Sequence, residues 1–246
     1  MTSNQFFVKR IDPNAGSLFL EGDEHHHLSR VARIKAGDEV WIFDEGGSRF
    51  LAEVEAVTRD RTRLRIIRRG EDVAPRPAVV LGQAVIKSRN MDLIVQKAAE
   101  LGISAIVPLV SVRSLPGRED GCGTKVDRWR KIALEAAKQS RRSSVPAIEK
   151  PLELSAFIRK ESTSRKLYLS ENGGTRLGEV LTRELDGRTL PGSVTVVTGP
   201  EGGWAPEEEK GFEEYGFDRI SLGQTVLRAE TAAIAAMAMI VHFWTE

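Results

Sequence analysis

Cysteine is almost absent from this chain, which contains Cys122 and no other among its 246 residues. A single cysteine cannot close a disulfide within the chain, so the class of small disulfide-stapled secreted domains is excluded. Cys122 lies in the sequence GCGT with no neighbouring histidine, and we expect an incidental thiol in a flexible stretch rather than a nucleophile. The start, MTSNQFFVKR, lacks the apolar run of a secretory signal, so the expected compartment is the cytoplasm.

Several site signatures are missing as well. Neither GxGxxG nor GxxxxGK(S/T) occurs, so nothing predicts a Rossmann or P-loop phosphate cradle. His25, His26 and His27 are consecutive, but adjacent side chains diverge and no Cys or second His cluster completes a site, so we expect no metal. The tryptophans are too dispersed for a stacking platform, and packing is expected for Trp41, Trp129, Trp204 and Trp244.

Apolar residues make up 41% of the sequence, enough for a sizeable core, and they follow two patterns on either side of a pair of prolines. Pro75 and Pro77 favour an extended connector, which we place at 73–77. Before it, short apolar runs separated by glycines are typical of a small β-barrel covering 1–72. These runs are 18–20, 40–43, 50–57 and 64–67.

After the connector, apolar strands alternate with amphipathic helices. This alternation predicts a parallel α/β sheet with crossover helices over 78–246. Strands are expected at 78–85, 105–108, 166–170, 194–198 and 220–222, with helices at 91–101 and 126–139. The last helix, 230–244, is apolar almost all round but shorter than the about 20 residues of a membrane span. It is expected to be buried in a core or against another subunit, with His242 as a core histidine.

Two glycine-containing apolar strings carry most of the functional information. Residues 194–204 read VTVVTGPEGGW, and residues 220–232 read ISLGQTVLRAETA. In each, a short strand stops at a glycine-containing loop, and two such loops together favour a ligand cleft. The simpler alternatives are tight turns for the glycines and helix capping for Thr231.

The strings GPEGGW and LGQTVLRAETA resemble the RsmE family, bacterial methyltransferases of the SPOUT class that modify N3 of a uridine in small-subunit ribosomal RNA. The likeness covers nearly the whole chain, through 26–37 (HHLSRVARIKAG), 87–102 (KSRNMDLIVQKAAELG) and 129–146 (WRKIALEAAKQSRRSSVP). It implies a C-terminal trefoil knot, a homodimer and an N-terminal PUA-like RNA-binding barrel. The implied substrate is ribosomal RNA within the assembled small ribosomal subunit.

The resemblance also implies S-adenosylmethionine as the methyl donor, held by three loops that follow strand ends. Glycine-bent loops suit this ligand because they offer backbone groups to the adenine edge and leave the methyl group uncrowded. The implied contacts are Leu169, Glu171, Thr198, Gly199, Pro200, Glu201, Gly202, Leu222, Gly223, Val226, Leu227, Arg228 and Thr231.

Uracil N3 normally carries a proton, so its methylation requires that the proton leaves or that the resulting anion is stabilised. Arg228 is our candidate for stabilising that anion as a preorganised donor. Glu230 is the second candidate catalytic residue, with the alternative that it only favours the helix N-terminus. Glu201 is another carboxylate within reach, and the sequence does not identify the base.

The net charge of +1 neither requires nor excludes nucleic acid, but the basic residues are clustered. Residues 113–142 hold nine Lys or Arg against four acids, and residues 59–69 hold six Arg against one Asp. Arg61, Arg63 and Arg65 share one face if they lie on a strand. Such a face either contacts RNA phosphates or is an ordinary solvated surface. The predicted RNA contacts are Arg10, Arg30, Arg33, Lys87, Arg89, Arg141 and Arg142.

Two positions depart from the family pattern. Gln5 and Thr225 stand where many members have arginine, so this chain either lacks an interaction with RNA or substrate or makes it through other basic residues. Two rival functions stay open: a SPOUT-fold RNA-binding protein without catalysis, and a methyltransferase that acts at another RNA position.

Overall fold

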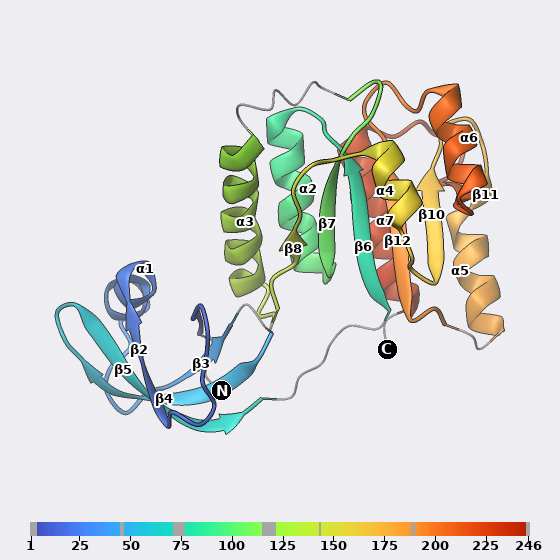
Figure 1. Ribbon diagram of the computed structural model, residues 1–246. Coiled ribbons are helices and arrows are strands. Elements are labelled where there is room, and N and C mark those ends of the chain that lie inside the picture. The colour runs from blue at the N-terminus through green and yellow to red at the C-terminus, as the bar shows by residue number, and fades with distance from the viewer. Residues whose placement is uncertain are drawn as a thin grey trace. The chain divides into compact units, whose positions relative to one another are not determined.

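The computed structural model describes residues 4–44, 47–70, 77–114, 122–142, 144–187 and 190–244. The chain divides into two compact units (Figure 1). The first comprises Met1–Val73 with Ala137–Val145, and the second comprises Ala74–Ala136 with Pro146–Glu246. Of the connector predicted at 73–77, residues 73–76 lie outside the described ranges.

A five-stranded mixed sheet forms the N-terminal unit, in the order β1-β3-β4-β5-β2. The strands are β1 (Gln5–Phe7), β2 (Ser17–Glu21), β3 (Glu39–Phe43), β4 (Arg49–Val57) and β5 (Arg61–Arg69). β1 pairs with β3 in parallel, and the other pairs are antiparallel. All four predicted strands are confirmed, and a short helix α1 (Gly22–His26) with a π-helical turn (His27–Val31) follows β2.

Side-chain alternation on β5 separates a core face from an outer face. Thr62 and Leu64 are buried, whereas Arg61, Arg63 and Arg65 are exposed, so the prediction that these arginines share one face is confirmed. Period-two alternation is what a strand with one buried face requires. The buried face carries Leu20, Val40, Ile42, Val54 and Leu64.

The segment 137–145 packs within this first unit through a buried ion pair. Lys138 Nζ donates to Glu24 Oε1 at 2.7 Å, and these side chains are only 9% and 16% exposed. Glu24 Oε2 accepts the backbone N–H of Phe7 at 3.0 Å. The side-chain amide of Gln5 donates to the carbonyl of Arg142, and burial lowers the pKa of the Arg142 guanidinium. Part of the basic run at 113–142 therefore serves internal packing.

The second unit contains a parallel sheet in the order β11-β13-β10-β12-β6-β7-β8, with β9 also paired to β7. The pairings described in this sheet are all parallel, which confirms the predicted α/β sheet. The strands are β6 (Ala78–Ala84), β7 (Ala105–Val110), β8 (Ala147–Ile148), β9 (Leu152–Glu153), β10 (Arg165–Leu169), β11 (Thr175–Arg176), β12 (Ser193–Thr198) and β13 (Asp218–Ser221). Central strand β12 is buried from Val194 to Thr198, as expected for a sheet covered on both faces.

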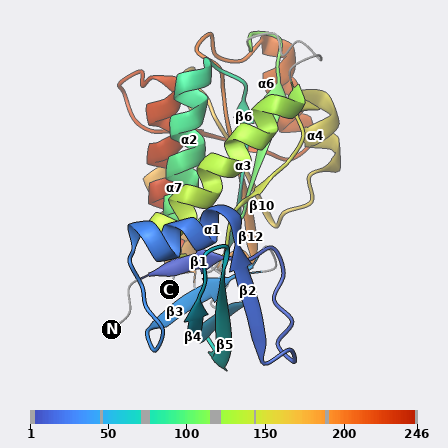
Figure 2. The same cartoon turned by 90° about the vertical axis from the view of Figure 1, so that its left-hand side faces the viewer.

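Helices cover both faces of this sheet. Their bounds are α2 (Ser88–Leu101), α3 (Cys122–Gln139), α4 (Leu154–Lys160), α5 (Leu177–Asp186), α6 (Pro206–Glu214) and α7 (Ala229–Trp244). Figure 2 shows α2 and α7 on one side of the sheet and α4 and α6 on the other. In the described part of the chain, no helix combines the length and apolar character needed to cross a membrane.

Two local expectations are wrong. Cys122 begins α3 instead of lying in a flexible stretch, so this helix starts earlier than predicted. His242 is exposed rather than buried, and its ring contacts Phe243. The buried stripe of α7 is Ala233, Ala236, Met237, Ile240 and Trp244, and His242 lies about 200° around the helix from Ile240. An almost uniformly apolar helix carries no sequence signal for which side faces the sheet.

Replacing Lys138 by Met is expected to destabilise the protein by about 3 kcal/mol, because Glu24 would keep a largely buried charge without its partner. Urea unfolding measures the loss. Lys131→Met on the same helix is the control, since Lys131 is exposed and should change stability by no more than about 0.5 kcal/mol. Equal effects of the two substitutions would contradict a structural role for the Lys138–Glu24 pair.

Candidate functional site

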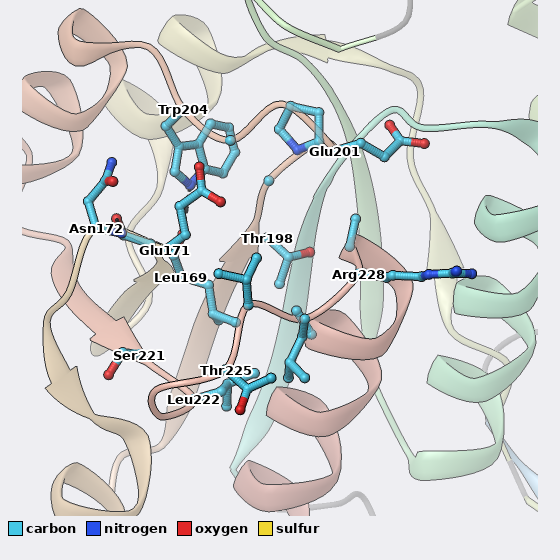
Figure 3. Close-up of a pocket in the computed structure, with 18 of the residues that line it drawn as sticks. Leu169, Glu171, Asn172, Thr198, Glu201, Trp204, Ser221, Leu222, Thr225 and Arg228 are labelled. Carbon is cyan, nitrogen blue, oxygen red and sulfur yellow. Dashed lines mark hydrogen bonds between the residues drawn. The ribbon is translucent and has the colours of Figure 1, made fainter.

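A cavity of about 910 Å³ lies where three neighbouring parallel strands end (Figure 3). β13, β10 and β12 are adjacent in the sheet, so the loops that leave their carboxyl ends meet at one edge. Ligands of open α/β sheets bind in crevices outside the carboxyl ends of the strands. The structure therefore brings together both glycine loops and the third strand end at Leu169, as the sequence predicted.

Most of the predicted cofactor contacts line this cavity. Those that do are Leu169, Glu171, Thr198, Gly199, Pro200, Glu201, Leu222, Gly223, Val226, Leu227 and Arg228, together with the predicted catalytic residue Glu230. Gly202 and Thr231 are not among the lining residues. The carbonyl of Gly202 instead accepts a hydrogen bond from Arg113 Nη1 at 2.8 Å, and Thr231 is exposed on α7.

The cavity wall also includes residues that sequence reasoning did not assign to it. Lys87, predicted as an RNA contact, and Asn90 lie where β6 passes into α2, at the same carboxyl edge. Asn172, Trp204 and Glu209 complete the wall beside β10 and α6. Lys87 follows a buried strand, and this position could have suggested a place at the carboxyl edge of the sheet. Its presence in the cavity wall also requires that β6 lies next to β12, which the local sequence does not reveal.

Trp204 ties two of the pocket loops together. Its indole Nε1–H donates a hydrogen bond to the carbonyl of Leu169 at 2.7 Å. Trp204 lies in the loop after β12 and Leu169 at the end of β10, so the bond joins these two segments. The indole is buried and meets the ring of Phe212 edge-on, with 5.0 Å between centroids. A Cβ on Gly199 would lie 3.2 Å from Trp204 Cε2, so the glycine allows the indole its close approach. The expected packing role of Trp204 is confirmed, with a hydrogen bond added.

Glycine at position 203 has a double requirement. Gly203 has φ +68°, a left-handed conformation that side chains rarely adopt. A Cβ there would also lie 2.6 Å from Glu171 Oε1, so the carboxylate of Glu171 rests directly against the Gly203 backbone. The close approach of Gly203 therefore helps to set the position of the Glu171 carboxylate in the cavity wall.

The charged groups of the cavity are largely uncompensated. Within the described residues, no ion pair is found for Glu171, Glu201, Glu230 or Arg228. The carbonyl of Arg228 accepts the N–H of Ala232 at 2.8 Å and so caps the start of α7. Figure 3 shows the guanidinium group of Arg228 extending away from Leu169 and Glu171. Arg228 therefore does not anchor its loop against a carboxylate of the described chain.

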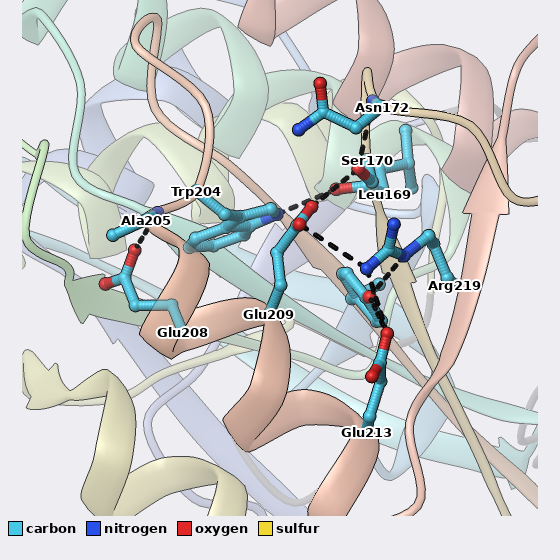
Figure 4. A network of polar contacts seen from close by, with 10 residues as sticks. Leu169, Ser170, Asn172, Trp204, Ala205, Glu208, Glu209, Glu213 and Arg219 are labelled. Carbon is cyan, nitrogen blue, oxygen red and sulfur yellow. Dashed lines mark hydrogen bonds and ion pairs between the residues drawn. The ribbon is translucent and has the colours of Figure 1, made fainter.

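Glu209, by contrast, is committed to a polar network that supports the loop after β10 (Figure 4). Ser170 Oγ donates to Glu209 Oε1 at 2.7 Å and accepts the N–H of Asn172 at 3.1 Å. Arg219 Nη2 lies 3.4 Å from Glu209 Oε2, and Arg219 Nε donates to the Tyr168 hydroxyl at 2.7 Å. Burial raises the pKa of the Tyr168 phenol, so Tyr168 remains a neutral member of the network.

The other predicted RNA contacts are spread over both units. Arg10, Arg30 and Arg33 are exposed in the first unit, and Arg89 is exposed on α2. Arg141 is exposed with φ +58°, whereas the neighbouring Arg142 is half-buried and bonded within the first unit. Arg141 and Arg142 thus differ in environment, although the sequence presents them as a pair.

Comparison with protein families gives two matches that together span most of the chain. Residues 74–241 match an RNA methyltransferase domain. Residues 20–67 match an RNA methyltransferase PUA domain. The match to the PUA domain ends before Pro75, and the match to the methyltransferase domain begins at residue 74 and includes both prolines.

Curated and solved relatives extend this comparison. Ribosomal RNA small subunit methyltransferase E of Mycobacterium bovis is 30% identical, over 96% of this chain and 90% of the relative. The protein of the same name from Aquifex aeolicus is 32% identical, over 93% of this chain and 96% of the relative. A crystal structure of the Neisseria gonorrhoeae protein of that name, bound to S-adenosyl methionine, superposes with a TM-score of 0.87 at 27% identity and covers 98% of both chains.

Replacing Trp204 by Phe is expected to cost about 0.5–1.5 kcal/mol more than replacing Trp129 by Phe, because the partly buried Leu169 carbonyl would lose its donor. Trp129 is the matched control: it is also buried, and its indole has no hydrogen bond among the described residues. Both substitutions remove the same volume. Equal losses in urea unfolding would show that the hydrogen bond does not hold the loops together.

Proposed function

This chain belongs to the ribosomal RNA small subunit methyltransferase E family, and from that premise we propose that it transfers a methyl group from S-adenosylmethionine to N3 of a uridine in small-subunit ribosomal RNA. The observation that carries the proposal is the cavity at the shared carboxyl edge, lined by both glycine loops and the end of β10. A methyltransferase needs at this place a pocket for the methyl donor that stays open to a base.

The residues of the cavity fit the methyl donor. The volume of the cavity falls within the range of about 300 to 1,000 Å³ that is usual for small-molecule sites. Gly223 has φ +122° and open space around its missing Cβ, so the loop offers its backbone closely to a ligand. Val226 and Leu227 are exposed beside it and supply an apolar wall. We propose that the peptide groups of Leu222, Val226 and Leu227 bind the adenine.

The uncompensated carboxylates suit the positive charge of the donor, because S-adenosylmethionine supplies its methyl group from a sulfonium. Glu171, which lies against Gly203, and Glu201 both line the cavity, and we propose that they bind the ribose or face this cation. A carboxylate without a protein partner gains most from such a ligand charge. These carboxylates therefore favour a cationic ligand over an anionic one.

For the acceptor, we propose that Arg228 stabilises the uracil anion and that Glu230 receives the N3 proton. Arg228 has no carboxylate partner in the described chain, so its donors are available to a carbonyl oxygen whose negative charge grows during the reaction. Glu230 lines the cavity from the first turn of α7, where a carboxylate also interacts favourably with the helix dipole. The same dipole supports the alternative that Glu230 serves the helix alone.

The finer architecture is part of the same proposal. We infer a trefoil knot around the loop at 222–228, a PUA-like barrel in residues 1–72, a connector at 73–77 and a catalytic domain at 78–246. A homodimer is supported by α7, whose outer side exposes Phe243. Work on ribosomal RNA, within the assembled small subunit, implies a cytoplasmic site of action. We propose no role for a metal in the reaction.

The experiment that tests the activity is mass spectrometry of nucleosides from small-subunit ribosomal RNA incubated with the protein and S-adenosylmethionine. We expect 3-methyluridine, at one position. A methyl group on ribose or on another base would favour the rival methyltransferase function. Binding of the RNA without binding of S-adenosylmethionine would favour the non-enzymatic rival.

Replacing Gly199 by Val is expected to abolish binding of S-adenosylmethionine while the protein stays folded. The new side chain would meet Trp204, whose Cε2 lies only 3.2 Å from the Cβ position, and would push the loop into the cavity. Isothermal titration calorimetry measures the binding. The matched control is Gly202→Ala, whose Cβ would meet Arg113 at an ordinary 3.4 Å outside the cavity. Parental affinity in Gly199→Val would remove this loop from the cofactor site.

Replacing Arg228 by Lys is expected to slow single-turnover methylation by about 100- to 1000-fold at saturating S-adenosylmethionine, because lysine keeps the charge but lacks the planar donor fork. Affinity for S-adenosylmethionine and the melting temperature should stay near the parental values, since the Arg228 side chain has no hydrogen bond or ion pair within the described chain. Arg183→Lys, at an exposed position on α5, is the control. Near-parental turnover would end the catalytic assignment of Arg228.

A further inference from the structure

Trp41, on the face of the N-terminal sheet opposite the core residues Val40 and Ile42, lies against two arginine side chains. The guanidinium carbon of Arg49 is 4.0 Å from the ring centroid of Trp41, and that of Arg68 is 5.2 Å away. Trp41 is half-buried on β3, so its expected packing role describes only part of its surroundings. Two cations are thus gathered on one aromatic ring.

The sheet register explains how residues far apart in the sequence meet there. Trp41 pairs with Leu51, and Leu51 pairs with Arg68, so the side chains of this row project on the same face. The register shifts between Leu51 and Ala52, leaving Ile67 as an extra residue on β5. Such a bulge changes which face the following side chain takes. It places Arg68 on the outer face, where Arg65 also lies.

Within the described residues, Arg49 and Arg68 have no carboxylate partner, unlike Arg63 and Arg65 on the same face. Arg63 Nε lies 2.9 Å from Glu55 Oε2, and Arg65 is paired with Glu53. No carboxylate of the described chain pairs with Arg49 or Arg68. Acids of β4 therefore neutralise two arginines of the predicted basic stripe of β5, and among the described residues of this face the arginines without a carboxylate partner lie beside Trp41.

Holding two like charges together is unfavourable, and a bound anion would reduce this repulsion. The Nε atom of Arg49 is buried and has no hydrogen-bond partner among the residues that the structure describes. Burial, and second the positive charge of Arg68, lower the pKa of the Arg49 guanidinium. Stacking on an aromatic ring holds a guanidinium plane in place and leaves N–H groups at its rim, which is the geometry that grips phosphate oxygens.

We propose that Trp41, Arg49 and Arg68 form a binding site for RNA backbone phosphates on the outer face of the N-terminal sheet. The proposal rests on the proposed function, because that function makes RNA the substrate. The site reads backbone charge rather than sequence, so it positions the RNA without choosing the target base. None of the individual RNA contacts predicted from the sequence belongs to this cluster.

The test is filter binding of in vitro transcribed small-subunit ribosomal RNA to the full-length protein over a series of potassium chloride concentrations. Arg49→Gln with Arg68→Gln is expected to weaken binding and to reduce the log-log salt slope by about 0.7 to 0.9 for each phosphate that is no longer neutralised. The matched control, Arg63→Gln with Arg65→Gln, removes the same charge from the same face but from arginines that are already paired. It is expected to leave the slope nearly unchanged.

Arg68→Gln alone covers the case in which replacement of Arg49 impairs folding, because Arg68 is exposed. It should still lower the slope by the amount that one phosphate contributes. Equal slopes for Arg68→Gln and the parent, or equal slopes for the two double variants, would overturn the site. A double variant at Arg49 and Arg68 that no longer binds polyglutamate but keeps parental RNA binding would also overturn it, in favour of an acidic protein partner.

Methyl transfer and S-adenosylmethionine binding are measured on the same preparations. A parent protein that methylates RNA while the Arg49 and Arg68 variants keep its salt slope contradicts this site alone. A parent that shows the expected slope differences but transfers no methyl group contradicts the proposed function and leaves the site intact. A parent that binds no RNA contradicts both.

Discussion

The adjacency of β13, β10 and β12 in one parallel sheet is the constraint on which the candidate site depends. Because the strands run in the same direction, their three following loops meet at one edge, and the cavity forms between them. The hydrogen bond from Trp204 to the Leu169 carbonyl joins two of these loops, and the network around Glu209 supports one of them from behind. Groups with structural partners surround the cavity, while Glu171, Glu201, Glu230 and Arg228 line it with no ion-pair partner in the described chain.

The difference between charged groups that have a protein partner and those that have none in the described chain indicates which residues are available to a ligand. A residue already satisfied by the protein gains little from a ligand, whereas an uncompensated charge gains much. Glu209 is bound by Ser170 and Arg219, whereas Glu230, our candidate for the proton acceptor, has no ion-pair partner in the described chain. The same reasoning applies on the N-terminal sheet, where Arg63 and Arg65 are paired but Arg49 and Arg68 have no carboxylate partner among the described residues.

Local pattern predicts the longer strands of both units and the helices α2, α3 and α7, because such elements leave a direct periodic signal, whereas the short strands β1, β8, β9 and β11 and the helices α1, α4, α5 and α6 are not among the predicted elements. The glycine loops are also readable, since φ values such as +68° at Gly203 require that residue. Long-range pairing is not readable. That β6 lies beside β12, and so brings Lys87 to the cavity, depends on strand order rather than on local sequence.

The wrong prediction for His242 and two features that the sequence does not reveal have the same physical origin. The prediction for His242 is wrong because α7 is apolar on nearly every side and its orientation is set by the sheet it covers. The arginines of β5 form one stripe in the sequence, but the acids that neutralise two of them come from β4, and the bulge at Ile67 redirects Arg68. Gly202 belongs to the same string as its neighbours, whereas its carbonyl is turned to Arg113.

Hydrogen–deuterium exchange with and without S-adenosylmethionine tests most directly the central claim that one edge of the parallel sheet holds the methyl donor. The account predicts that the ligand slows exchange in 169–173, 198–204 and 221–230 together, because all three segments border one cavity. The N-terminal sheet should exchange at the same rate in both states. Protection confined to a different part of the chain, or no protection at saturating ligand, would contradict the account.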